Sequence, residues 1–139
     1  MERCRGFSLL ELIIVTAIIA ILAALATQSY ARYAFRSRRS DAQQMLMAIA
    51  HGQERWYAIH NRYTDDLSKF GYNDPAISPH GYYEVTLAVA GSSAQAFIAT
   101  AAPINSQVGD VCGSLSIDNA GNKKPTRTDG MANANGGCW

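Results

Sequence analysis

Glu11 has the most unusual chemical setting in the sequence, because it is a carboxylate beside a long apolar run. No charged residue occurs from Leu12 to Thr27. As an α-helix, the segment from Phe7 to Thr27 would be about 31 Å long, close to the hydrocarbon thickness of a membrane. An unpaired carboxylate at that depth costs about 2.5–3.5 kcal/mol. We therefore expect Glu11 to pair with a cation, and cleavage after Gly6 would supply one as a neighbouring chain's new amino terminus.

The rest of the sequence offers little for catalysis. His51, His60 and His80 form no Glu-x-x-His or His-x-x-x-His pair, so we interpret them as surface residues, not metal ligands or a catalytic base. The sequence has no Gly-x-Ser-x-Gly motif, phosphate-binding glycine loop or Cys-x-x-Cys motif. The segment from Asp118 to Gly121 lacks the alternating oxygen ligands of a calcium loop and predicts a hairpin turn. We expect no enzyme, metal site or cofactor.

One long helix should come first in the chain. No proline precedes Pro75, so nothing prevents a helix from about Phe7 to about Ile59. Its second half predicts an amphipathic helix, with polar positions on other faces. The expected buried residues are Ala42, Met45, Leu46, Ile49, Trp56 and Ile59, and the expected outward residues are Arg38, Asp41, Gln44 and Arg55. We interpret Gly52, within this helix, as a tolerated residue.

The remaining pattern predicts an antiparallel sheet. Residues 61–81 indicate a connecting loop with a short helical turn at 65–70. Residues 83–89 alternate between apolar and other side chains, which is typical of a strand with one buried face, and residues 91–93 should close a hairpin. Further strands are expected at 95–102, at 114–118 and near Lys123. The fold class is therefore α+β, with Leu46 and Trp56 covering the apolar face of the sheet.

The amino-terminal residues resemble those of the type IV pilin family. Its precursors have a short basic leader ending in glycine, then phenylalanine, then an apolar run with glutamate at its fifth position, and Gly6, Phe7 and Glu11 match these positions. Later segments add to a resemblance to the PilE-type pilins of Gram-negative bacteria. They are Arg62-Tyr63-Thr64, Gly81-Tyr82-Tyr83, Ala101-Ala102-Pro103, Cys112-Gly113-Ser114-Leu115 and Cys138-Trp139.

This resemblance implies a processing and assembly scheme. A prepilin peptidase would cleave after Gly6, Phe7 would be N-methylated, and the apolar helix would polymerise with Glu11 paired to a neighbour's Phe7 amine. The implied parts are a leader at 1–6, a transmembrane and assembly helix at 7–27, and a globular domain at 28–139. The expected locations are the inner membrane, with a periplasmic carboxy-terminal domain, and then the pilus at the cell surface. The expected partners are other pilin subunits, the peptidase, the inner-membrane assembly machinery and membrane lipid.

The three cysteines fit an exported protein once the leader is removed. Cys4 lies in the leader, so Cys112 and Cys138 remain as a pair. A disulfide closing a loop of that length should stabilise a small domain by about 3 kcal/mol or somewhat more.

The carboxy-terminal tail contains one basic group, formed by Lys123, Lys124 and Arg127. Some pilins of this type are DNA receptors for transformation, so DNA is one partner to consider. Three cations without interleaved aromatic residues give little affinity at physiological salt, and the overall charge is nearly balanced, with 12 basic and 11 acidic residues. We therefore prefer a solvated loop to a DNA contact here.

Two features conflict with this scheme. The basic cluster of Arg32, Arg36, Arg38 and Arg39 outweighs the two arginines of the leader, so the positive-inside rule alone would reverse the orientation. We expect the leader to prevail, with the cluster against lipid headgroups or in the filament stem. In addition, Ala24-Leu25-Ala26 resembles a signal-peptidase site, and cleavage there would release a soluble binding domain starting near Thr27.

The preferred function is that of a minor type IV pilin supporting pilus biogenesis, and with it twitching motility, adhesion or DNA uptake. Many pilins have a glycine and a proline in the apolar half, where this chain has Ala20 and Gln28. Without these helix-breaking residues the helix should stay more continuous on assembly, which favours a minor over a major subunit. A type II secretion pseudopilin, which shares the leader and anchor, is the nearest alternative.

Overall fold

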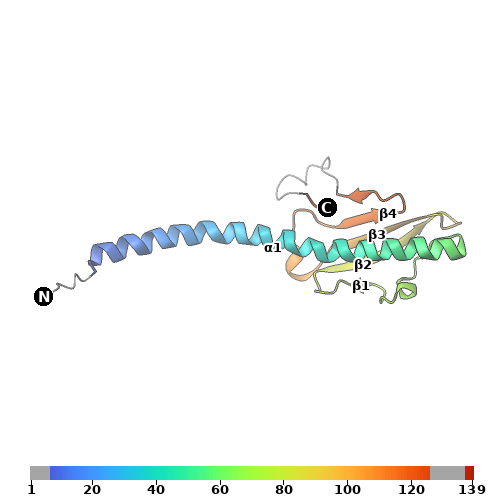
Figure 1. Ribbon diagram of the computed structural model, residues 1–139, viewed down its shortest axis with the longest axis horizontal. Coiled ribbons are helices and arrows are strands. Elements are labelled where there is room, and N and C mark those ends of the chain that lie inside the picture. Colours follow the sequence, from blue (N-terminus) through green and yellow to red (C-terminus); the bar gives the residue numbers. More distant parts are fainter. Residues whose placement is uncertain (1–6, 126–136) are drawn as a thin grey trace. The chain divides into compact units, whose positions relative to one another are not determined.

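The computed structural model describes residues 7–125 and 137–139. The chain forms two compact units, Met1–Ala34 and Phe35–Trp139, and the helix α1, Leu9–His60, contributes to both (Figure 1). These helix bounds confirm the predicted long helix to within two residues. The carbonyl of Ser8 accepts hydrogen bonds from the amides of Glu11 and Leu12, which starts the first turn.

In the first unit, the stretch of α1 from Leu12 to Ala26 carries no charged side chain. This part of the helix is long and apolar enough to cross a membrane, and none of its apolar window is buried. The Thr16 hydroxyl donates to the carbonyls of Leu12 and Ile13, at 3.0 Å each, so its polar group is satisfied within the helix. Such a segment has its backbone polar groups paired internally, and from Leu12 to Ala26 it offers a partner no charged side chain.

The second unit is the remainder of α1 on a five-stranded antiparallel sheet. The strands are β1 Ala76–Ile77, β2 Tyr83–Ala90, β3 Ala96–Pro103, β4 Leu115–Asp118 and β5 Lys123–Lys124, and they pair in chain order (Figure 1). Two short 3-10 helices, η1 Leu67–Phe70 and η2 Asn105–Gln107, lie in the connections. The predicted α+β class, the strands from 83 onward and the helical turn near 65–70 are confirmed. The short strand β1 falls in the segment predicted as loop.

The core lies between this half of α1 and the sheet. The helix contributes Ala42, Met45, Leu46 and Ile49, and the facing strands contribute Tyr83, Val85, Phe97, Ala99, Ala101, Leu115 and Ile117. All of these side chains are buried, so the period-two and helical patterns were interpreted in the correct register. Burial of this apolar surface is the main favourable term in folding.

Two predictions for the inner face of the helix were wrong. Ile59 is 79% exposed, because the inward position after Ile49 is occupied by Gln53, whose amide bonds the backbone of Thr64. Trp56 is only half-buried and stacks on His60, with ring centroids 3.7 Å apart, so it does not cover the core of the sheet.

Asp41 is buried, although it was expected on an outer face. Its carboxylate accepts from the His80 backbone amide at 3.3 Å and lies 2.8 Å from the His80 ring, so burial leaves it paired. Gly52 is also more than a tolerated residue. A Cβ there would lie 2.8 Å from the Phe70 ring, which indicates close packing against η1.

Candidate functional site

The carboxy terminus is fastened to the domain by a disulfide and by hydrogen bonds. Cys112 and Cys138 are joined and buried, with their Cα atoms 5.7 Å apart, as the cysteine pairing predicted. Gln43 on α1 donates to the carbonyl of Cys138 at 2.9 Å, and the indole of Trp139 donates to the carbonyl of Lys124 at 2.7 Å. The last two residues of the chain are therefore held against both the helix and β5.

A buried polar network supports the loop that carries Cys112. The Arg39 guanidinium makes a bidentate contact with the Asp110 carboxylate, at 2.7 and 2.5 Å, and both side chains are almost fully buried. The Gln107 amide donates to Asp110, to the hydroxyl of Tyr83 and to the carbonyl of Phe35. The ion pair and its hydrogen bonds compensate the cost of taking these charged groups out of water. The network therefore fixes this loop on the helix.

The environment of Tyr83 follows from this network. Burial raises its pKa to about 12, and the nearby Asp110 carboxylate acts in the same direction, while the Gln107 hydrogen bond and the Arg39 charge oppose it.

Arg39 corrects the interpretation of the basic cluster. Arg39 is buried inside the domain, so it is not available to a lipid headgroup, whereas Arg38 is half-exposed, bonds Ser106 and lies over the Tyr82 ring at 4.8 Å. Sequence reasoning missed the network because Arg39 and Asp110 are 71 residues apart.

Two of the three predicted basic residues of the tail lie side by side on β5. Lys123 and Lys124 are exposed, and the Lys123 ammonium lies 5.0 Å from the centre of the Trp139 ring. Arg127 lies outside the described residues. Within the described residues β5 is the last strand of the sheet and pairs with β4, so these cations lie at the border of the described sheet.

The turn between β4 and β5 is a hairpin turn, as predicted. The Asp118 carboxylate accepts from the backbone amides of Ala120 and Asn122 and from the Asn122 side chain, each at 2.9 Å. These hydrogen bonds hold the pKa of Asp118 below its usual value.

The other predicted residues are distributed as follows. Phe7 and Glu11 are exposed, and within the part of the chain that the structure describes no side chain forms an ion pair with Glu11; Gly6 lies outside it. His51 and His60 are exposed and the ring of His80 is 73% exposed, consistent with surface histidines. Over residues 7–125 and 137–139, no three metal-binding side chains come together.

Comparison of the fold defines the class of protein. The structure of a type IV pilin from Shewanella oneidensis superposes with a TM-score of 0.56 and 30% identity, over 76% of this chain and 97% of that one. Among curated proteins, the Type IV major pilin protein PilA of Myxococcus xanthus is 38% identical over 80 residues, and the Type IV major pilin protein PilE1 of Neisseria gonorrhoeae is 34% identical over 83 residues. The matches span 58% and 57% of this chain, and 36% and 48% of those relatives.

The family comparison is more specific. The family described as "Type IV minor pilin ComP, DNA uptake sequence receptor" matches residues 28–116, and the "Prokaryotic N-terminal methylation motif" matches residues 1–27. The chain therefore belongs to this family of type IV minor pilins. The predicted pilin resemblance and pilin fold are confirmed.

Proposed function

We propose that this chain is a minor subunit of a type IV pilus that takes part in DNA uptake. The observation that carries the proposal is the match of one chain to both the methylation motif, over residues 1–27, and the minor pilin family, over residues 28–116. The exposed apolar half of α1 supports assembly by helix packing. The disulfide between Cys112 and Cys138 supports a role for this loop in presenting the exposed surface of the subunit. Head-to-tail contacts between such subunits do not close, so they build a filament.

Processing and assembly follow the same proposal. The leader, residues 1–6, is removed after Gly6 by a prepilin peptidase, and Phe7 is N-methylated. Residues 7–27 hold the subunit in the inner membrane, with residues 28–139 in the periplasm, until the assembly machinery transfers it to the pilus. Glu11 then pairs with the Phe7 amine of a neighbouring subunit, which removes the cost of an unpaired carboxylate among apolar helices.

Replacing Glu11 tests this assembly contact. In Glu11→Val the leader is still removed, because the cleavage site is unchanged, but the subunit is absent from sheared filaments. Glu11→Asp, which keeps the negative charge, serves as the matched control and retains part of the incorporation. Immunoblots of membrane and sheared fractions measure both steps. Normal incorporation of Glu11→Val would contradict the assembly role.

We further propose that Lys123, Lys124 and Arg127 contact the phosphates of DNA. The family's description as a DNA uptake sequence receptor reverses our preference for a solvated loop. Lys123 and Lys124 are exposed on an edge strand, and an aromatic ring lies beside them, which the sequence pattern alone did not indicate. Such contacts give salt-dependent affinity, because each neutralised phosphate releases counterions.

A pair of triple variants tests this interface. Alanine at Lys123, Lys124 and Arg127 should abolish the duplex DNA shift in a gel. The control has alanine at Arg55, Arg62 and Lys69, three cations elsewhere in the domain that are exposed in the structure, so the change in net charge is identical. The control should bind like the parent. Equal binding by both triple variants and the parent would contradict the assignment.

A further inference from the structure

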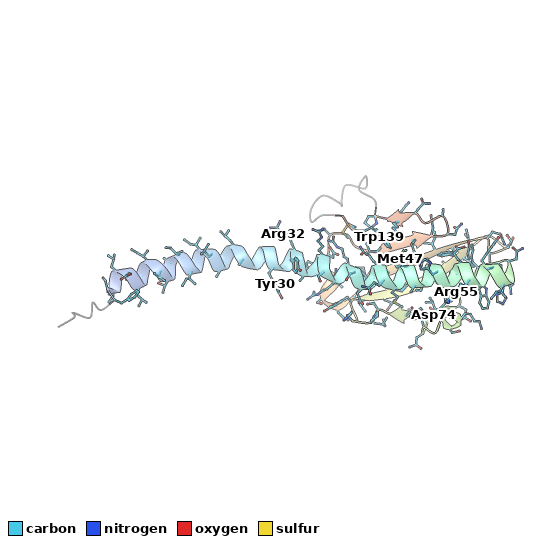
Figure 2. All side chains as sticks on the ribbon, in the orientation of Figure 1. Tyr30, Arg32, Met47, Arg55, Asp74 and Trp139 are labelled. Carbon is cyan, nitrogen blue, oxygen red and sulfur yellow. A yellow bond between two sulfur atoms is a disulfide. The ribbon has the colours of Figure 1, made fainter. Side chains whose placement is uncertain are left out.

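A groove lies beside β5, next to the basic residues assigned above to DNA contact. It lies between the second half of α1 and the carboxy terminus, has a volume of about 520 Å³, and lies within the second unit. Figure 2 labels two of its walls, Met47 on α1 and Trp139 at the chain end. The lining residues are Gln43, Gln44, Met47, Ala48, His51, Lys123 and Trp139. This volume is in the range of pockets that hold small molecules.

The Trp139 ring is held in place before any ligand binds. Its indole nitrogen donates to the Lys124 carbonyl, the preceding residue is in a disulfide, and Gln43 bonds that residue's carbonyl. An aromatic side chain fixed in this way loses little freedom on binding, so stacking against it retains more of its energy. The groove therefore presents a preorganised aromatic surface.

The charge of the lining selects among ligands. None of the lining residues is acidic, and the Lys123 ammonium lies 5.0 Å from the Trp139 ring centre. Gln44 adds an exposed amide that can both donate and accept. A flat ring joined to an anion matches this combination, whereas an aliphatic side chain would leave the cation and amide unused.

We propose that the groove binds one unpaired nucleobase of a DNA strand, stacked on Trp139, with the adjoining phosphate on Lys123. This inference rests on the proposed DNA binding and adds a preference for unpaired nucleotides. Stacking on an aromatic ring is tolerant of sequence, because every base has a flat face. A base within an intact duplex is already stacked, so the groove distinguishes single-stranded ends from paired DNA.

The test compares two DNA probes on the mature protein in nanodiscs of zwitterionic lipid. Fluorescence anisotropy measures Kd for labelled dT12 and for a blunt 12-base-pair duplex. Trp139→Ala should weaken dT12 binding about tenfold, the order expected for the loss of one stacked base, and duplex binding less than twofold. Trp139→Phe, which keeps a ring, should recover part of the loss. Trp56→Phe, which changes the other tryptophan, should bind like the parent.

A variant on the opposite wall tests the groove without changing the carboxy terminus. Met47→Glu places a carboxylate where the base would lie, and should also weaken dT12 binding selectively. In the parent, the indole proton resonance of Trp139 should shift as dT12 is added, and that of Trp56 should not. These results together would support the proposal.

Four outcomes would overturn it. Parent-like dT12 affinity in Trp139→Ala and Met47→Glu, with duplex binding intact, would refute the stacking groove and leave the DNA-binding proposal standing. Equal losses for dT12 and duplex would mean that Trp139 only positions Lys123 and Lys124. If the groove variants bind dT12 normally but fail to enter filaments, the occupant is another pilin subunit. Absence of binding to either probe by the parent would refute DNA binding itself, a result distinct from the other three.

Discussion

The two halves of α1 use apolar residues in opposite ways. From Leu9 to Ala26 the side chains are exposed in the isolated chain, whereas the later half buries one face and covers a sheet from the same chain. The same secondary structure therefore packs its apolar side chains against a sheet in one half and leaves them exposed in the other. Apolar surface left without a partner within the chain indicates binding to lipid or to other subunits.

The largest expected loss of stability comes from a substitution in the second unit, where α1 packs on the sheet. Asp110→Ala would leave the buried guanidinium of Arg39 without its carboxylate and should destabilise the second unit by about 3–5 kcal/mol. Urea unfolding followed by near-ultraviolet circular dichroism measures the change. Asp65→Ala, at an exposed aspartate, is the control and should change stability by less than about 0.5 kcal/mol. Equal stability of the two variants would show that the network is not structural.

A matched pair of isoleucines compares the two halves directly. Ile49 is fully buried and Ile18 is 52% exposed. Ile49→Ala should destabilise the second unit by about 2–5 kcal/mol, from lost burial and the cavity left behind, whereas Ile18→Ala should leave its unfolding unchanged. The same urea experiment on both variants measures this contrast. If Ile18→Ala unfolds as easily as Ile49→Ala, the proposed difference between the two halves of α1 is wrong.

The smallest expected effect concerns alkaline stability. Tyr83 has its pKa raised to about 12 by burial, compared with 10.0 for the free side chain. Its contribution to stability is therefore complete below about pH 10 and is lost as the pH rises through 12, because the unfolded state releases this proton first.

Tyr83→Phe should make the loss of stability between pH 10 and 12 less steep than in the parent. Urea midpoints at several pH values measure it. The pKa of Tyr63 is also raised, mainly by burial, but Tyr63 is present in both proteins and its effect cancels in the comparison. Parallel pH profiles would mean that Tyr83 titrates normally.

The sequence predicted the parts of the fold that depend on apolar periodicity. Residues 83–89 and 115–117 alternate as half-buried strands do, and Ala42, Met45, Leu46 and Ile49 recur at helical spacing, so their burial was expected. The pairing of Cys112 with Cys138 followed because the third cysteine, Cys4, falls in the predicted leader.

Buried polar residues were not predictable in the same way. Arg39, Asp41 and Gln53 are buried because partners distant in sequence satisfy them, and periodicity assigns such residues to the outside. The two-residue strand β1 is too short to give an alternating pattern. The Trp139 groove was missed for a similar reason, since its walls come from α1, β5 and the chain end. Only the terminal tryptophan itself was visible as a signal.

The most direct test of the central claim is the intact mass of the protein from the membrane fraction of cells that contain a prepilin peptidase. The pilin account predicts a chain that begins at Phe7, carries one added methyl group and is reduced in mass by the Cys112–Cys138 disulfide. A chain that begins near Thr27 would instead indicate a released soluble domain, and would contradict assembly through the amino-terminal helix.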